Sequence, residues 1–359
     1  MNIFIAFMLI LSAVGLCDKI LGGKRGLGAE FDHGIHTMGG MALSLVGIYC
    51  LGITLVQKQA DSVAKLSAVL PFDPSLIIGS LLAPDLGGYT IAMNMASNRL
   101  VGLFSGLLVA ATLGCTISFV LPVSMAAIKK EDASAMMNGL ILGIVTIPAS
   151  LIVGGLLLGL PLKDFLSNGL PILLICVLLY LLLTKAPKMT TKILMGFANV
   201  IQFLCFSFFG VVMAGLFIPS WQIASYNLVC ESLVVVAKIT VVVCGAMVLS
   251  HIALTRFLRP IRWVARHLKI NDSSAVGLLL SLATSVSMLP LFDRMDHRGK
   301  VMNAAFSVSG AFVLGGQLAF VSSLETSQVV RIYMISKLCG GICAVIAAML
   351  TAPADPDVV

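Results

Sequence analysis

The sequence predicts an all-α, polytopic membrane protein, and three observations support this prediction. The chain is 59% hydrophobic and only 11% charged, with a mean hydropathy of +1.06 over 359 residues. Its apolar runs are long and continuous rather than alternating, which favours helices over strands. No long polar linker, low-complexity tract or block of charge interrupts them. We therefore expect residues 1–359 to form a single integral membrane domain within the lipid bilayer.

Nine apolar segments are candidates for membrane-spanning helices. In chain order they cover about 2–21, 35–56, 100–122, 135–160, 170–184, 194–218, 231–255, 301–322 and 330–351. The first run, Met1 to Cys17, lacks the basic region of a cleaved signal peptide, so we expect it to be retained as the first span. Residues 352–359 are expected to form a short tail.

Two further apolar segments, 74–96 and 274–293, contain helix breakers near their middle. The first is interrupted by Ala-Pro-Asp-Leu-Gly-Gly-Tyr at 83–89, and the second by Thr-Ser-Val-Ser-Met-Leu-Pro at 284–290. Such breaks free backbone amides and carbonyls, which survive at membrane depth only where they are buried in protein or line a polar cavity. Each segment is either a kinked full span or a re-entrant pair of half-helices that enters and leaves on one side.

The distribution of Lys and Arg among the loops favours the re-entrant form. If both broken segments spanned the membrane, the two sides would carry twelve and eight of these residues, whereas re-entrant segments give sixteen and four. The uneven division is the better one, because Lys and Arg concentrate in cytoplasmic loops. It places the N-terminus outside and the C-terminus in the cytoplasm. The four basic residues on the outer side are then Lys58, Lys65, Arg99 and Lys163.

A faint internal repeat agrees with this topology. The Phe-Ser pairs at 104–105 and 306–307 each follow a broken segment, and each Phe precedes a glycine, Gly114 or Gly316, by ten residues. An odd number of crossings separates these two helices in the re-entrant topology, so the halves would be inverted. Inverted halves whose broken helices meet near the midplane are a recurrent plan of secondary transporters. The predicted halves cover about 1–160 and 194–351, with 170–184 as a linking helix.

The acidic residue at the first break is the strongest candidate for a binding group. An acid is costly to expose to lipid, so Asp85 is expected to face the protein interior. Its carboxylate, the carbonyl end of the preceding half-helix and the Tyr89 ring together suit a small cation, especially an ammonium group. Gly87 and Gly88 would let the backbone approach a ligand closely. Alternatively, Asp85 only caps the following half-helix.

The second break offers hydroxyl groups rather than charge. Its candidates for contact with a substrate hydroxyl are Thr284, Ser285 and Ser287. Ser and Thr in membrane helices more often bond to the preceding turn or pack as small residues. Asn303 and Gln317 lie on roughly one side of the next helix, and interhelical hydrogen bonding is as good an interpretation as ligand contact. Glu325, at the outer end of that helix, is expected to be solvated.

Three titratable residues lie where a Gly-rich loop leads into the second span. Asp32, His33 and His36 could line an entrance or gate and would respond to pH, or could simply cap the loop. Metal binding would require convergent ligands that the sequence does not show. We therefore expect neither a metal nor a cofactor.

Several classes of function are disfavoured by the sequence. The net charge of +7 is explained by loop Lys and Arg that orient the protein, so no nucleic-acid partner is expected. The sequence contains no G-x-S-x-G, P-loop or H-E-x-x-H motif, which argues against an enzyme and against an ATP-driven pump. The expected partner is a small cationic solute, and the oligomeric state has no signal in the sequence.

Four blocks of sequence are long and distinctive. They comprise Phe31 with Gly34 and Met38-Gly39, then Asp85–Gly88, Gly143–Pro148 and Met295–Asn303. In these blocks, and over most of its length, the chain resembles the ethanolamine-utilisation permease family, EutH. The resemblance implies a multi-pass permease of the bacterial cytoplasmic (inner) membrane that moves ethanolamine, or a closely related small protonated amino alcohol, into the cell.

The chain departs from the family pattern at several polar positions. Thr284 and Ser285 stand where the family usually has two Asn residues, Gln317 lies near a usual Asp-His pair, and His33 replaces an acid. Alternatives are therefore a carrier of another small amine or alcohol, or a non-transporting membrane scaffold or sensor. In the preferred interpretation the ammonium group binds at Asp85 and Tyr89. Channel-like, uniport and proton-symport mechanisms all stay open.

Overall fold

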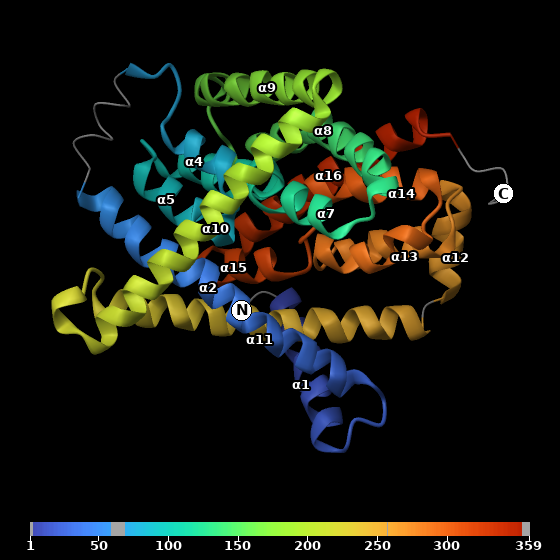
Figure 1. Cartoon of the computed structure of the whole chain (residues 1–359), viewed down its shortest axis with the longest axis horizontal. Coiled ribbons are helices and arrows are strands. Elements are labelled where there is room, and N and C mark those ends of the chain that lie inside the picture. The colour runs from blue at the N-terminus through green and yellow to red at the C-terminus, as the bar shows by residue number, and fades with distance from the viewer. Residues whose placement is uncertain (1–2, 59–68, 257, 354–359) are drawn as a thin grey trace.

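The computed structural model describes residues 3–58, 69–256 and 258–353, and every regular element in these ranges is helical (Figure 1). The predicted class, a helical membrane protein, is confirmed. Figure 1 shows α9 (Leu162–Lys185) along the top, α11 (Tyr226–Arg256) along the bottom and α10 (Pro187–Phe217) crossing between them. The predicted tail, 352–359, lies mostly outside the described residues.

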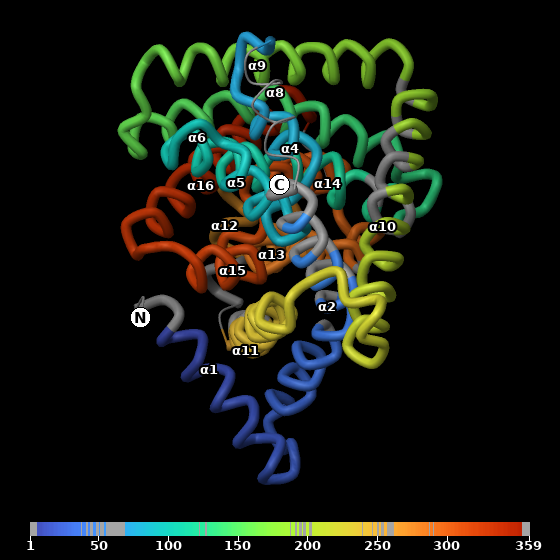
Figure 2. Tube along the Cα trace, turned by 90° about the vertical axis from the view of Figure 1, so that its left-hand side faces the viewer, coloured from blue at the N-terminus to red at the C-terminus, as the bar shows by residue number. Residues whose placement is uncertain are grey.

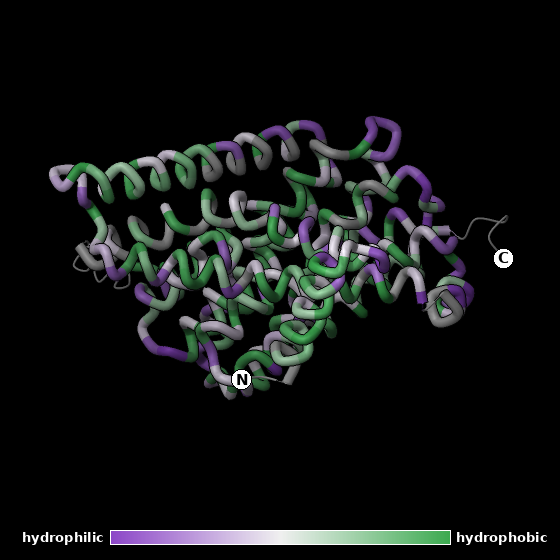
Figure 3. Tube along the Cα trace, turned by 90° about the horizontal axis from the view of Figure 1, so that it is seen from below, coloured by the Kyte–Doolittle hydropathy of each residue, from purple (hydrophilic) through white to green (hydrophobic). Residues whose placement is uncertain are grey.

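Five helices of the described chain are long and apolar enough to cross a membrane. They are Arg99–Met125, Lys130–Leu158, Leu162–Lys185, Tyr226–Leu249 and Ser327–Thr351. They match five of the predicted spans, and α1 (Ile3–Ile20), α2 (Leu27–Lys58) and α10 are helical at three others. Figure 3 shows apolar residues along most of the helices and hydrophilic ones mainly towards their ends. The total of nine spans stays a prediction.

The first broken segment folds into a hairpin of two short helices, α4 (Ser75–Leu81) and α5 (Gly88–Met95), joined by the turn η1 (Pro84–Leu86). One side chain holds both ends of this hairpin. Oδ1 of Asp73 accepts a hydrogen bond from N of Ser75 (3.0 Å), and its Oδ2 accepts one from N of Ser97 (2.9 Å). The chain therefore enters and leaves the hairpin at neighbouring points.

The second broken segment, α13 (Asp272–Ser281) and η6 (Ser285–Arg294), is held in a similar way. Oδ1 of Asp296 accepts hydrogen bonds from N of Asn271 (2.9 Å) and Oγ of Ser274 (2.7 Å). Its Oδ2 accepts one from N of Gly299 (3.1 Å), in the first turn of α14 (His297–Ser309). Here too, one aspartate joins the start of the segment to its end.

The helix that follows the first hairpin is continuous and almost wholly buried. This central helix, Arg99–Ala127, comprises α6 (Arg99–Leu103), η2 (Phe104–Gly114), η3 (Thr116–Val120) and α7 (Leu121–Ala127). Elements η2 and η3 are π-helical, which is unusual over such a length because π-helices normally occur as single turns. The hairpin packs on it through a bond from Oγ of Ser75 to Oγ of Ser105 (3.0 Å).

The helix that follows the second hairpin is interrupted, so the predicted continuous helix over 301–322 is wrong at its centre. Residues 310–315 separate α14 from α15 (Gly316–Leu324). The amides of Phe312 and Leu314 donate to the carbonyls of Ser281 (3.0 Å) and Leu282 (2.7 Å) at the end of α13. Phe312 also has a φ of 64°, which no α-helix contains. Bonds to the hairpin thus replace bonds within the helix.

Two long helices pack closely through small residues. A short turn η4 (Lys130–Asp132) leads into α8 (Ala133–Leu158), which crosses α16 (Ser327–Thr351). Oγ of Ser150 donates to the carbonyl of Ser336 (2.9 Å), and Oγ of Ser336 donates to the carbonyl of Ser150 (2.8 Å). Gly154 and Gly340 lie at the same crossing and leave room for the close approach.

Candidate functional site

Asp85 lies in η1, in a tight turn between the two half-helices. The amides of Leu86 and Gly88 both donate to the carbonyl of Ala83, at 3.1 and 3.0 Å. Gly87 has a φ of 87°, a conformation that strongly favours glycine. A Cβ at Gly88 would lie only 2.6 Å from the carbonyl oxygen of Ala83. Both glycines are therefore required by the turn itself.

The carboxylate of Asp85 is incompletely bonded. Its Oδ1 is buried and has no hydrogen-bond partner among the described residues. The residue as a whole is half-buried. A buried, unpaired carboxylate oxygen is costly unless a donor or cation satisfies it. This position therefore favours a ligand that carries a donor.

A lysine that the sequence analysis did not single out lies near this acid. Lys337, in α16, is 1% exposed. Its Nζ donates to the carbonyl of Ala111 in the central helix (2.6 Å) and to Oε1 of Gln317 in α15 (3.4 Å). The charge of Lys337 acts on the carboxyl group of Asp85, but no ion pair within 4 Å joins them in the described structure.

Gln317 is the hub of the hydrogen bonds in this region. Its Oε1 accepts from the hydroxyl of Tyr333 (3.2 Å) as well as from Lys337, and its Nε2 donates to Sγ of Cys115 (3.1 Å). The amide also lies beside the carboxyl group of Asp85. We name Asp85, Cys115, Gln317, Tyr333 and Lys337 the central cluster. Of its members, Asp85 and Gln317 were predicted from the sequence.

Tyr89 belongs to a second polar network. Its hydroxyl donates to the carboxylate of Glu325, and Nη2 of Arg99 donates to Oε2 of the same carboxylate (2.6 Å). The Glu325 side chain is 1% exposed, so the expectation that it is solvated is wrong. An exposed arginine from one half of the chain explains this, because it neutralises the buried acid from the other half. We name Tyr89, Arg99 and Glu325 the outer network.

The remaining candidates at the second break make contacts within their own half. Oγ1 of Thr284 accepts from N of Val286 (3.4 Å) and caps η6, while Ser285 is buried. Nδ2 of Asn303 donates to the carbonyls of Ser274 and Gly299, both at 2.9 Å, and so holds α13 against α14. The side chain of Ser287 lies outside the described part of the protein. A ligand role for these residues stays a prediction.

Two ion pairs join the halves at the opposite end from the outer network. Nζ of Lys300 lies 2.6 Å from Oδ1 of Asp132, and both side chains are largely buried. Nζ of Lys129 lies 3.1 Å from Oδ2 of Asp293, and both are exposed. The hydrogen bond from Lys129 lowers the pKa of Asp293 below its ordinary value of 3.8. We name these four residues the inner pairs.

The predicted entrance residues lie at the start of α2, beside α1, in the part of the molecule that projects downwards in Figures 1 and 2. Asp32 pairs with Lys19, and its carbonyl lies 2.7 Å from Nδ1 of His36. Nδ1 of His33 lies 3.5 Å from Oε2 of Glu30. The described residues contain no group of three or more His, Cys, Asp or Glu side chains that could hold a metal.

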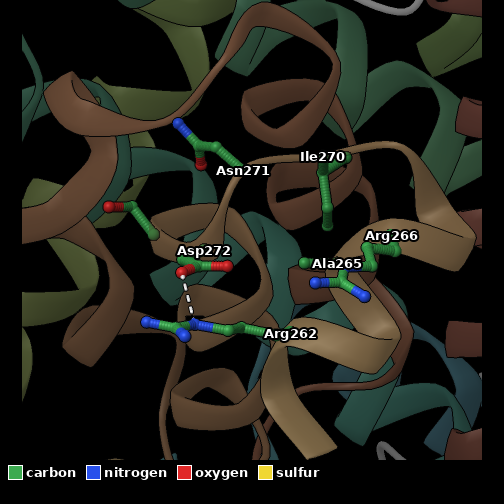
Figure 4. A pocket seen from close by; sticks show the side chains of 7 residues that line it. Arg262, Ala265, Arg266, Ile270, Asn271 and Asp272 are labelled. Carbon is green, nitrogen blue, oxygen red and sulfur yellow. Dashed lines mark hydrogen bonds and ion pairs between the residues drawn. The ribbon is translucent and has the colours of Figure 1, made fainter. Parts of the chain in front are cut away.

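A hollow of about 590 Å³ lies on the surface where α12 (Leu258–Leu268) meets the start of α13 (Figure 4). It is lined by Arg262, Ala265, Arg266, Ile270, Asn271, Asp272 and Ser273. Nε of Arg262 lies 3.4 Å from Oδ2 of Asp272, and both side chains are well exposed. The hollow contains no member of the central cluster. It lacks the buried acid that would hold a small cation within the membrane.

Comparison with known proteins gives a consistent result. The sequence matches the family described as "Ethanolamine utilisation protein, EutH" over residues 1–351. "Probable ethanolamine permease EutH" of Listeria monocytogenes is 34% identical over 348 residues, which cover 96% of this chain and 92% of that protein. The protein of the same name from Salmonella typhimurium is 31% identical over 396 residues, covering 99% and 95%. "Uncharacterized protein YxeR" of Bacillus subtilis is 31% identical, covering 95% and 92%. No solved structure matches the chain.

Proposed function

The chain belongs to the EutH family of ethanolamine utilisation proteins, and on this premise we propose that it carries ethanolamine, or a closely related small protonated amino alcohol, into the bacterial cell. Relatives of the chain are named probable ethanolamine permeases, and five described helices are long and apolar enough to cross a membrane, which supports a transport role.

The single observation that carries the proposal is the unsatisfied Oδ1 of Asp85 at a break between two half-helices. An ammonium group offers this oxygen both a positive charge and hydrogen-bond donors, and charge-assisted bonds of this kind are the strong ones. In this proposal the amide of Gln317, which lies beside the same carboxyl group, binds the hydroxyl of the amino alcohol. Its present bond to the sulfur of Cys115 is to a weak acceptor, which a hydroxyl can replace.

We further propose that the hairpins at 74–96 and 274–293 are re-entrant and lie in inverted halves, with nine spans around them. The aspartates that join the ends of each hairpin support this topology, because each segment starts and finishes on one side. The outer network and the inner pairs both connect the first half to the second. Opening one set while the other holds would expose the central cluster to one side at a time, as alternating access requires.

Uptake of labelled ethanolamine into proteoliposomes tests the proposal. Asp85→Asn keeps the size of the side chain but removes its charge, and we expect it to lower the initial rate at least tenfold. Asp272→Asn, which makes the same change at an exposed position of α13, should transport like the wild type. Gel-filtration profiles of the purified variants check folding. Undiminished uptake by Asp85→Asn would remove this residue from the mechanism.

The same assay distinguishes the alternative functions. Competition by a panel of small amines and alcohols should show the strongest inhibition by molecules with both an ammonium and a hydroxyl group. Strong competition by amines alone would indicate a carrier of a different amine. A folded protein that moves none of these solutes would instead be a scaffold or sensor.

A further inference from the structure

The central cluster contains one acid and one base, both within the bundle of helices. Asp85 comes from the first half of the chain, whereas Lys337 comes from the second. Lys337 is 1% exposed, and its hydrogen-bond partners among the described residues are neutral, namely the carbonyl of Ala111 and the amide of Gln317. With both groups ionised, the cluster has no net charge.

The other titratable groups that face Lys337 do not alter this balance at neutral pH. Among the described residues they are Cys115 from the central helix and Tyr333 from α16, whose ring centroid lies 5.7 Å from Nζ. Thiols and phenols are ordinarily neutral at this pH. The neighbouring elements η2, α8 and α15 contain no ionisable side chain. Those of α14, which also packs on α16, lie in its first turn, where Arg298 donates to the carbonyl of Met349 and Lys300 pairs with Asp132. The charge of the cluster is therefore set by Asp85 and Lys337 alone.

A cationic substrate upsets this neutrality. An ammonium group bound at Asp85 beside a protonated Lys337 would leave a net positive charge in a region of low dielectric, where an uncompensated charge is costly. Loss of one proton from Lys337 restores neutrality. Neutral lysine still reaches its partners, since its amine can donate to the carbonyl of Ala111.

We propose that the amine cation and the proton of Lys337 compete for Asp85, so that the protein exchanges one substrate cation for one proton. This inference rests on the proposed function and deepens it. In the outward-facing state, RNH3+ binds at Asp85 and Lys337 releases its proton to the outside. In the inward-facing state, RNH3+ leaves and Lys337 takes a proton from the cytoplasm. The protonated lysine then pairs with Asp85 during the return, and the full cycle moves no net charge.

Exchange makes a prediction opposite to that of a simple cation uniporter. A uniporter would be driven by the membrane potential, and 100 mV, negative inside, corresponds to about 50-fold accumulation of a monovalent cation. The rate of an electroneutral exchanger does not depend on the potential. Because a proton leaves as each cation enters, its uptake is favoured instead by a proton gradient directed outwards. The test is made in proteoliposomes at slightly acidic pH, where little free amine crosses the lipid unaided. Vesicles with Asp85→Asn supply the background.

For the wild type we expect two results. The potential, set with potassium and valinomycin, should change the rate of ethanolamine uptake less than twofold. A pH dye trapped inside should report alkalinisation, with one proton leaving for each labelled ethanolamine that enters. Uptake that rises several-fold with the potential, or that occurs without proton efflux, would overturn the exchange. Absence of ethanolamine uptake would instead contradict the proposed function itself.

A substitution at the lysine provides the second arm. Lys337→Gln removes the exchangeable proton but retains a donor for the carbonyl of Ala111. We expect its uptake to become dependent on the potential and to proceed without proton efflux. Lys238→Gln, at an exposed position of α11, is the matched control and should behave as the wild type. If Lys337→Gln retains potential-independent, proton-coupled uptake, the assignment of Lys337 is wrong. If that variant fails to fold, the wild-type measurement decides alone.

Discussion

The two hairpins share a plan but rest on different supports. In the first half, α4 and α5 pack on the unbroken central helix, and Oγ of Ser118 accepts a hydrogen bond from N of Ala83 (3.2 Å) just before the tip. In the second half, the end of α13 bonds to the interrupted stretch 310–315. In the first half, the charged tip of the hairpin thus lies against a continuous helix. In the second half, the corresponding helix is interrupted at 310–315, and Gln317 follows directly after the interruption.

In the proposed inverted topology, this difference would give two related halves a single asymmetric site. The acid comes from the tip of one hairpin, whereas the amide and the lysine come from helices behind the other. The hydroxyl groups at the second tip make no described contact with this cluster. Relative movement of the halves would therefore change the distance between Asp85 and Lys337 directly.

The largest expected effect breaks the packing of the first hairpin. A Cβ at Gly79 would lie 2.1 Å from the carbonyl oxygen of Ser105, a backbone atom that cannot move aside. At Gly277 the nearest atoms, 2.4 and 2.5 Å away, belong to side chains rather than to the backbone, namely the terminal methyl group of Met295 and the amide oxygen of Asn303. We expect Gly79→Ala to cost about 3 kcal/mol of stability and Gly277→Ala about 1 kcal/mol. Melting temperatures of the purified proteins in detergent measure both, and equal losses would contradict the difference between the supports.

The next effect concerns the outer network. Arg99→Ala leaves the buried carboxylate of Glu325 with the hydroxyl of Tyr89 as its remaining described partner, and we expect a loss of about 2 kcal/mol. Arg99→Lys restores the charge and should recover part of the loss. The readout is thermal unfolding of each variant. Stability unchanged by Arg99→Ala would mean that water already solvates Glu325.

A smaller loss of stability is expected when the polar side chains that hold each hairpin to its helix are removed. Asn303→Ala removes one hydrogen bond to the carbonyl of Ser274 in α13 and one to the carbonyl of Gly299 within α14, with an expected loss of about 1.5 kcal/mol. Ser105→Ala removes the single bond to Ser75, with an expected loss of about 1 kcal/mol. Chemical denaturation of both variants tests the order. The reverse order would show that the first hairpin depends more on polar contacts than on close packing.

The smallest effect belongs to the exposed inner pair. Lys129 lowers the pKa of Asp293, so the ionised carboxylate stabilises the fold at every pH above 3.8, the ordinary pKa of this group. This contribution is lost as the pH falls through the lowered pKa. We expect Asp293→Asn to reduce the melting temperature slightly at neutral pH and not at all in strong acid. A difference that does not vary with pH would exclude this ion pair as its cause.

Much of the architecture could be predicted from sequence because the relevant signals are local. Proline, glycine and an acid together at 83–88 identified the first break, and Gln317 was recognised as a polar residue in an apolar helix. Lys337 was not predicted, because the other basic residues considered lie in loops, where they orient the protein in the membrane. The available signal was a single lysine within the apolar run 330–351, which is itself grounds for a functional hypothesis. The break at 310–315 depends on amides that bond to a distant segment, which no local pattern reveals.

The π-helical stretch of the central helix, η2 and η3, would allow the later part of this helix to rotate. Each of its turns is closed by a hydrogen bond between residues i and i+5 rather than i and i+4, so a π-helical turn contains more residues than an α-helical turn. If one turn tightened, Cys115 and every residue after it would swing about the axis while Ala111 stayed in place. The bond between Ser75 and Ser105 would persist, whereas the bond from N of Ala83 to Oγ of Ser118 would have to follow the rotation or break. The carbonyl of Ala111, which binds Lys337, and the sulfur of Cys115, which binds Gln317, would then move apart without the unfolding of any helix.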